Sequence, residues 1–271
     1  MAGVTVSSLV TAHPGGVGHA VRVAGAVCGR GMRRISARPT LIMPVLLMPL
    51  IFVISFTGAF GSLTRVEGYG TDNVYNWMAV YAALQGAVFA GVGGAASTAE
   101  DIENGFFDRL LLTPGSRLPI LVGTMGYSAL RSTIPTTGVL LISALGGLSL
   151  PGGLLALVAT YVATAGMAAV FCLIGLAVVY RFRTMRSMLL IQVVGFSSMF
   201  LSTGQVPIHF MDGWLHAVAR VNPITNVLRF ARQGFLGDVA WSTTWPGLLA
   251  LGGMALVAGA LALRSLRSLE S

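Results

Sequence analysis

Apolar residues run in long stretches along most of this chain, and short polar segments separate them. A helix that crosses the hydrocarbon of a bilayer needs about 20 mostly apolar residues. Six stretches fit that description: roughly 41–62, 76–97, 120–147, 154–180, 187–203 and 245–263. The fifth is short, and Arg131 and Pro135 interrupt the third, which allows its first half to project from the membrane as a helix. The pattern therefore predicts an all-α integral membrane protein with six transmembrane helices.

The segment before the first span has a different pattern, in which apolar residues alternate with arginines. Its apolar positions between residues 18 and 37 are Val21, Val23, Val27, Met32 and Ile35. Such a segment suits an N-terminal interfacial helix on an anionic membrane surface. A poorly ordered basic tail is the alternative. We accordingly divide the chain into a cytoplasmic N-terminal segment with an amphipathic elbow helix, 1–38, and a six-span domain, 39–271.

Between the second and third spans lies a short, charged segment that holds four of the nine acidic residues, Glu100, Asp101, Glu103 and Asp108. Its apolar residues follow helical spacing and predict one amphipathic helix, which Pro114-Gly115 would end. They are Ile102, Phe106, Phe107, Leu110, Leu111 and Thr113. Two phenylalanines facing water are costly at about 25 cal/mol per Å². The residues alone leave two interpretations open: the helix occupies a groove on a partner protein, or it rests on the bilayer.

The segment before the last span, 204–244, carries helical signals of its own. Asp212 is placed to cap a short helix, and Asn222-Pro223 supplies an N-cap followed by proline at the first helical position. The apolar face of the second helix contains Ile224, Val227, Leu228, Ala231 and Phe235, and its polar face contains Asn226, Arg229, Arg232 and Gln233. We predict an outer re-entrant helical hairpin. It either gates an exit path or serves only as a lid that anchors the last span.

Polar residues within the predicted spans are a further group of candidates: Gln85, Gln192, Ser197, Ser198, Ser202 and Thr203. Such residues commonly hydrogen-bond between helices. The other interpretation is a substrate pathway lined by Gln85 and Gln192 together with Phe89 and Met199. Arg131 is expensive against lipid, so it is expected to reach the inner interface or to pair with a nearby acid, for which Glu100, Asp101 and Glu103 are equal candidates.

The composition supports a membrane protein and excludes several other classes. Hydrophobic residues make up 55% of the chain and charged residues 10%, against about 25% charged in soluble domains. All 17 basic side chains are arginine, and a phosphate-binding P-loop needs lysine, so any ATP chemistry must come from another subunit. The arginines are scattered at the ends of apolar stretches, which argues against nucleic-acid binding.

Neither metal-binding nor catalytic residues form a recognisable group. Cys28 precedes the first predicted span and Cys172 lies inside the fourth, so a disulfide between them is not expected. The two cysteines and four histidines are also not expected to form a metal site. No spacing of serine, histidine and acid suggests catalysis. The chain is therefore not expected to be an enzyme.

Arginine placement predicts the orientation of the spans, because cytoplasmic loops are enriched in basic residues. One side receives Arg22, Arg30, Arg33, Arg34, Arg38, Arg109, Arg117, Arg181, Arg183, Arg186, Arg264 and Arg267, and the other receives Arg65, Arg220, Arg229 and Arg232. Both termini are therefore predicted to be cytoplasmic. The arginine-only usage with abundant alanine, glycine and valine is typical of a GC-rich bacterial genome, so we expect a multi-pass protein of a bacterial inner membrane.

Three motifs now coincide in order. They are Arg38-Pro39 before the first span; Glu103-Asn104-Gly105 with Arg109-Leu110-Leu111 and Thr113-Pro114-Gly115-Ser116-Arg117; and Gly204-Gln205-Val206-Pro207, Trp214, Asn222-Pro223-Ile224-Thr225, Arg229 and Gly234. In this order and with this layout, the chain resembles over nearly its whole length the permease subunits of type-2 ATP-binding-cassette (ABC) exporters, daunorubicin-resistance-like branch. Phe106-Phe107 is bulkier than the usual pattern of that family.

The resemblance implies a transporter of two permeases, identical or related, with two cytoplasmic ABC ATPase subunits that bind ATP and magnesium; no cofactor is expected in this chain. It implies ATPase coupling through Glu103, Gly105, Phe106, Phe107, Arg109, Leu110, Leu111 and Pro114. It implies that the outer re-entrant segment includes Pro207, Trp214, Asn222, Pro223 and Arg229. The expected function is ATP-driven export of amphiphilic drugs or lipids from the cytoplasm or inner leaflet.

Two other classes of function remain alternatives at this point. A self-contained secondary carrier or membrane enzyme would need no ATPase partner, but a carrier usually has buried acids for ion coupling, and the predicted spans contain none. A membrane assembly factor would bind partners and transport nothing.

Overall fold

The computed structural model describes residues 16–111 and 117–268, and every regular element in that part of the chain is helical. The α-helices are α1 (Val17–Ala37), α2 (Met43–Phe60), α3 (Val74–Glu103), α4 (Phe106–Leu111), α5 (Leu118–Leu145), α6 (Leu154–Phe182), α7 (Ser187–Phe200), α8 (Gly213–Val221), α9 (Pro223–Leu236) and α10 (Trp241–Arg267). Short 3-10 helices are η2 (Pro39–Leu41), η3 (Gly61–Arg65) and η4 (Ile208–Phe210). The predicted all-α class is confirmed.

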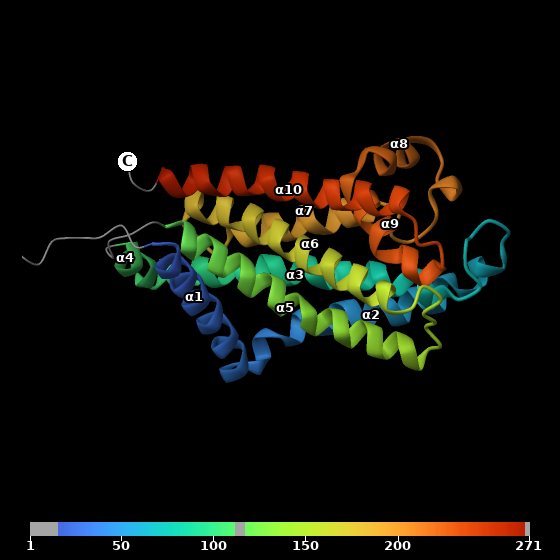
Figure 1. The fold of residues 1–271 in the computed structure, drawn as a ribbon, viewed down its shortest axis with the longest axis horizontal. Coiled ribbons are helices and arrows are strands. Elements are labelled where there is room, and N and C mark those ends of the chain that lie inside the picture. Colours follow the sequence, from blue (N-terminus) through green and yellow to red (C-terminus); the bar gives the residue numbers. More distant parts are fainter. Residues whose placement is uncertain (1–15, 112–116, 269–271) are drawn as a thin grey trace, which may run out of the picture.

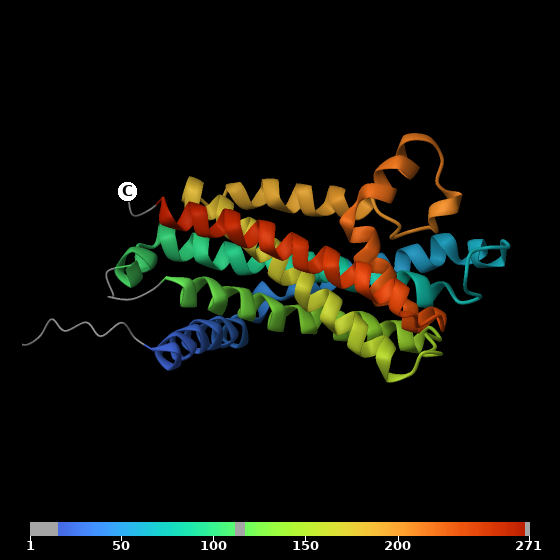
Figure 2. The ribbon, with the colours of Figure 1, turned by 45° about the horizontal axis from the view of Figure 1, so that its top comes forward.

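The long helices lie roughly along one axis, and short elements gather at the two ends of the bundle (Figure 1). Consecutive long helices run in opposite directions, in the order α2, α3, α5, α6, α7 and α10 (Figures 1 and 2). The "α4 end" carries α1, α4, the α6–α7 turn and the last residues of α10. The "α8 end" carries η3, the α5–α6 turn, α8 and α9. Loops that the arginine pattern assigned to one side therefore lie at one end of the bundle.

Helix α3 occupies the centre of the bundle, and each residue from 76 to 92 is buried. Its neighbours are α2, α5, α6, α7 and α9. Small residues allow α6 to approach closely: a methyl group at Gly91 would lie 2.4 Å from the carbonyl oxygen of Ala168, and one at Gly175 would lie 2.5 Å from Ala95 Cβ. Close backbone approach through small residues is the usual way in which helices associate within lipid.

Among the described helices, four are long and apolar enough to cross a membrane, and they contain Met43–Arg65, Val74–Glu103, Leu154–Phe182 and Trp241–Arg267. Ser187–Phe200 is apolar but shorter. Helix α5 is also long but more polar, since it includes Arg131 and several hydroxyl residues. It continues without a break through Arg131 and Pro135. Both residues are buried against neighbouring helices.

The N-terminal segment forms the predicted helix, α1, and this helix packs against α5 (Figure 2). Two glycines bring the helices together. A methyl group at Gly31 would lie 2.5 Å from the ring of Tyr127, and one at Gly123 would lie 2.6 Å from the carbonyl oxygen of Ala24. From Gly16 onward, the alternative of a poorly ordered tail is therefore wrong.

The two short helices predicted before the last span are confirmed as α8 and α9. Asn222 caps α9 as expected, since its side-chain oxygen accepts a hydrogen bond from the Ile224 amide at 3.0 Å. Its amide group also donates to the carbonyls of Ser198 at 2.7 Å and Leu201 at 2.9 Å, which ties α9 to the end of α7. Asp212 stands at the N-cap of α8, but its side chain makes no capping hydrogen bond.

Two residues of α9 are buried although the sequence assigned them to its polar face. Its apolar face is buried as expected, but Arg232 is only 2% exposed and Gln233 only 6%. The guanidinium of Arg232 donates hydrogen bonds to the carbonyl of Trp77 in α3 and to the carbonyls of Thr203 and Gly204 after α7, and it stacks on the ring of Trp77. These contacts replace the water that burial removes. Arg229 is exposed, as the pattern predicted.

Candidate functional site

The candidate site at the α4 end begins where α3 stops. Gly105 has a φ of +67°, a left-handed conformation that glycine adopts without steric cost. Its amide bonds to the Ile102 carbonyl at 3.0 Å and ends the helix. The prediction of one helix running from Ile102 through Phe106 is therefore wrong: Ile102 belongs to α3, and α4 starts at Phe106 after a turn. The apolar residues Ile102, Phe106 and Leu110 keep a spacing of four across the turn, so their periodicity alone could not locate the break between the two helices.

Helix α4 presents its two phenylalanines to different surroundings. Phe107 is 2% exposed and packs on Tyr180 of α6, with ring centres 5.6 Å apart. Phe106 is 43% exposed, and the guanidinium of Arg30 lies 4.6 Å from its ring centre. The groove that Phe107 needs is thus within this chain, whereas Phe106 remains available at the surface.

The other predicted coupling residues surround this helix. Arg109 is exposed and Leu110 is half-buried against the core. The side chain of Leu111 and the whole of Pro114, with the predicted helix end at Pro114-Gly115, lie outside the described residues.

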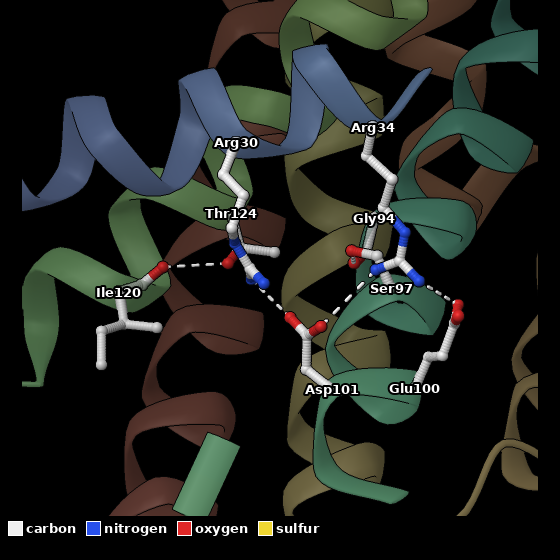
Figure 3. Close-up of polar contacts among 8 residues, drawn as sticks. All are labelled: Arg30, Arg34, Gly94, Ser97, Glu100, Asp101, Ile120 and Thr124. Atoms are coloured by element: carbon white, nitrogen blue, oxygen red, sulfur yellow. Dashed lines mark hydrogen bonds and ion pairs between the residues drawn. The ribbon is translucent and has the colours of Figure 1, made fainter. Parts of the chain in front are cut away.

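Acidic residues at the end of α3 bind α1 through ion pairs (Figure 3). Asp101 pairs with Arg30 and also with Arg34, whose Nη1 lies 3.5 Å from Asp101 Oδ1, and Glu100 pairs with Arg34. The side chain of Asp101 is 12% exposed, against 38% for Glu100. Asp101 is therefore the better shielded member of this cluster and the main connection between α1 and α3.

The remaining two acids of the segment bind the turn between α6 and α7. Asp108 Oδ1 lies 2.6 Å from Arg183 Nη2, and Glu103 Oε1 accepts a hydrogen bond from the Met185 amide at 2.7 Å. The α3–α4 segment is consequently connected on one side to α1 and on the other to the start of α7. A force applied to α4 would reach three long helices through these contacts.

Arg131, which was expected to reach the interface or an acid, is 7% exposed inside the bundle. Its Nη1 donates to the hydroxyl of Tyr127 at 3.3 Å. The guanidinium lies over Gly93, where a methyl group would be 2.7 Å from Nη1. A glycine at position 93 therefore provides the space that this arginine occupies.

An Asp101→Asn variant is expected to lower the free energy of unfolding by about 1–3 kcal/mol, because it removes the charge that two arginines share. Glu100→Gln removes one more exposed pair and should cost under about 1 kcal/mol. Thermal unfolding of the purified protein, followed by circular dichroism, measures both. Equal losses in the two variants would contradict the ranking of these two acids.

The residues predicted for the outer segment come together only in part. Asn222 joins α9 to α7, and Pro207 is buried near η4, whereas Trp214 is 71% exposed on α8 and Pro223 and Arg229 are exposed. The sequence had indicated each residue but not these separate surroundings.

The pathway candidates also differ in environment. Gln85 is 1% exposed on α3, and its amide makes no hydrogen bond to the described residues. Phe89 is buried and lies 5.2 Å from the ring of Phe196, and Met199 is buried too. Gln192 is exposed on α7. Three of the four side chains are therefore buried in the bundle, and Gln192 is at the surface.

Sequence reasoning missed Arg30, Arg34, Tyr180 and Arg183 as parts of the α4 site. The four-residue spacing of Arg30 and Arg34, which places them on one face of α1, was the available signal for two of them. Within residues 16–111 and 117–268, no group of three or more histidine, cysteine or acidic residues could hold a metal ion.

Comparison with known proteins gives a consistent result. The model of the ABC-2 type transporter family matches residues 23–236. The chain is 24% identical over 250 residues to the daunorubicin resistance ABC transporter permease protein DrrB1 of Streptomyces coeruleorubidus. This alignment covers 88% of this chain and 84% of that protein. It is 26% identical to the ycf38 proteins of Pyropia yezoensis and Porphyra purpurea, provisionally named transport permeases, over 221 and 217 residues; each alignment covers 76% of this chain and 71% of the relative.

Proposed function

Since this chain belongs to the ABC-2 type transporter family, we propose that it is the membrane permease of an exporter driven by a separate ATPase subunit. The resemblance drawn from its motifs is thereby confirmed, and the chain is a multi-pass membrane protein of a transporter. The observation that carries the proposal is the α3–α4 segment at the end of the bundle, whose four acidic residues connect it to α1 and the α6–α7 turn.

In this proposal six helices cross the membrane: α2, α3, α5, α6, α7 and α10. The polar character of α5 is compatible with a crossing because most of its polar residues face protein rather than lipid, and the exposed Thr133 and Thr137 bond to carbonyls of their own helix. Thr124, Ser128, Arg131, Ser132 and Thr136 are all buried, and intramembrane polar residues normally face the bundle interior. Helices α8 and α9 form the re-entrant hairpin, which packs through α9 against α6 and α10.

We further propose that the α4 end faces the cytoplasm of a bacterial cell, with both termini on that side. Support comes from the arginines of α1, the α6–α7 turn and the end of α10, all at this end. Basic residues near membrane spans favour the cytoplasmic side. The ATPase, which binds ATP and magnesium, then contacts α4 from the cytoplasm.

The native cysteines provide a test of this orientation. Burial raises the pKa of the Cys28 thiol, so its reactive thiolate forms at higher pH than in a free cysteine. Cys172 is fully buried. We expect a membrane-impermeant maleimide to label Cys28 slowly in inverted vesicles, faster as the pH rises, and not in intact cells. A Cys28→Ser variant serves as the control, and labelling of Cys28 in intact cells would reverse the orientation.

The mechanism follows from the connections of α4. ATP binding closes the ATPase pair and moves α4, and the ion pairs transmit that movement to α1, α3 and α7. The nucleotide changes the permease only to the extent that it binds one state better than the other. The permease pair then alternates between a state open to the cytoplasm or inner leaflet and a state that releases substrate outward.

We propose amphiphilic drugs or lipids as the substrates, in line with the daunorubicin resistance permease among the relatives. The pathway runs along α3 and α7. The amide of Gln85, which makes no hydrogen bond within the described part of the chain, supports this placement, since buried polar groups are normally bonded. A second permease, identical or related, and membrane lipids cover the exposed apolar residues of α2 and α10. These include Leu47, Ile51 and Ile54 on α2 and Leu249, Leu256 and Val257 on α10.

The proposal is tested by reconstitution. The tagged chain should co-purify with a soluble P-loop ATPase, and vesicles that contain both should take up an amphiphilic dye only with ATP. A catalytically inactive ATPase is the control. Transport by this chain alone, or ATP-driven transport that continues when α4 is replaced by a flexible linker, would refute it.

A further inference from the structure

A cavity of about 370 Å³ lies at the α8 end, remote from α4. The loop before α3, the segment around η4, and α9 surround it, and exposed residues such as Gly68, His209 and Arg229 on its rim show that it opens to the surface. Its volume falls within the range of about 300–1,000 Å³ that small-molecule sites occupy.

The most unusual residue of the lining is Arg232, which is 2% exposed. Its guanidinium donates to the carbonyls of Trp77 at 3.2 Å, Thr203 at 3.1 Å and Gly204 at 2.9 Å. It also lies 3.7 Å from the ring centre of Trp77. No acidic group within residues 16–111 and 117–268 forms an ion pair with it.

These contacts orient the arginine but do not balance its charge. Carbonyl groups are dipoles without net charge, and a buried charge is costly unless it is paired. Asp238 also lines the cavity, but it is exposed and forms no ion pair with Arg232. An anion in the cavity would supply the missing counter-charge.

Further groups around the cavity are suited to an anion. Arg229 and His209 on the rim add positive charge or hydrogen-bond donors. Trp77 Nε1 and Thr203 Oγ1, in two other lining residues, are buried without a hydrogen-bond partner among the described residues. Both are covered in this conformation, so they become available only when a ligand shifts the wall.

We propose that this cavity binds the phosphate or carboxylate group of an anionic ligand, with Arg232 as the buried counter-charge and Arg229 and His209 at the entrance. An amphiphile would leave its apolar part in the adjoining membrane, and a free anion would occupy only the polar part. The site goes beyond the proposed export function, because binding here needs neither the ATPase nor ATP.

The test uses the full-length chain in nanodiscs of zwitterionic lipid, without an ATPase. Isothermal titration with dodecyl phosphate, inorganic phosphate and uncharged dodecyl maltoside measures the affinities. We expect dodecyl phosphate to bind at least tenfold more tightly than dodecyl maltoside. An Arg229→Gln, His209→Gln double variant should weaken that binding roughly tenfold, a change of about 1.4 kcal/mol.

Arg65→Gln is the matched control, because Arg65 is exposed at the same end but does not line the cavity. Arg232→Gln should abolish the charge preference; if that variant fails to fold, the rim variant still decides. Comparable binding of inorganic phosphate would identify a free anion as sufficient, and much weaker binding would identify an anionic amphiphile. Equal affinity for the charged and uncharged amphiphiles, or a rim variant that binds like Arg65→Gln, would overturn the proposal.

Discussion

Gly91→Ala is expected to lower the stability of this chain strongly. The added methyl group would lie 2.4 Å from the carbonyl oxygen of Ala168 and 3.0 Å from the amide nitrogen of Cys172. Both are backbone atoms of α6, which cannot rotate away as a side chain could. We expect a cost of about 3 kcal/mol, the upper end of the usual range for overpacking.

The measurement is thermal unfolding of the purified protein in mild detergent. Gly252→Ala on α10 is the control, because this glycine is exposed and a methyl group there would meet nothing within 4 Å. Alanine is favoured over glycine in helices by up to about 1 kcal/mol, so the control should be neutral or slightly stabilising. A Gly91→Ala protein as stable as the control would show that α3 and α6 do not pack this closely.

Phe107→Ala should have an effect at least as large as that of Gly91→Ala. Removing a buried phenylalanine costs about 3–5 kcal/mol, and Phe107 is 2% exposed against Tyr180. The substitution also loosens α4 from α6. We therefore expect lower stability of the isolated permease and, where the complex still assembles, ATP hydrolysis without transport.

Phe106→Ala is the matched comparison, one residue away on the same helix. Phe106 is 43% exposed and contacts Arg30, and an exposed cation–π contact contributes about 0.5–1 kcal/mol. Stability should change little, while affinity for the ATPase should fall. Thermal unfolding measures the change in stability, and co-purification measures the affinity for the ATPase. If Phe106→Ala and Phe107→Ala behaved identically in both assays, the different surroundings of the two rings would be contradicted.

Local signals in the sequence located most of the helices. The Asn222-Pro223 step placed the start of α9 correctly, because capping involves only residues two or three positions apart. The hydropathy pattern placed α2, α6 and α10 within four residues of their observed ends and α3 within six, because each buried or lipid-facing stretch must be apolar along its length.

Contacts between distant segments were beyond local signals. Arg30 and Asp101 form an ion pair although 71 positions separate them in the sequence. No local pattern in either segment predicts that the two will meet. Polarity placed Arg232 on a water-facing side, but the carbonyls that satisfy it belong to α3 and to the residues after α7. Gly105 ends α3, although the apolar residues Ile102, Phe106 and Leu110 keep their four-residue spacing across the turn. That spacing therefore predicted one continuous helix.

The sequence by itself determined that this chain is helical and membrane-bound, because the length and apolar character of its segments are properties of the chain alone. Only the tertiary structure decided which phenylalanine of α4 is buried, what the four acids bind and where Arg232 lies. Those outcomes depend on which surfaces meet when distant helices pack, and packing geometry is not encoded in any single segment.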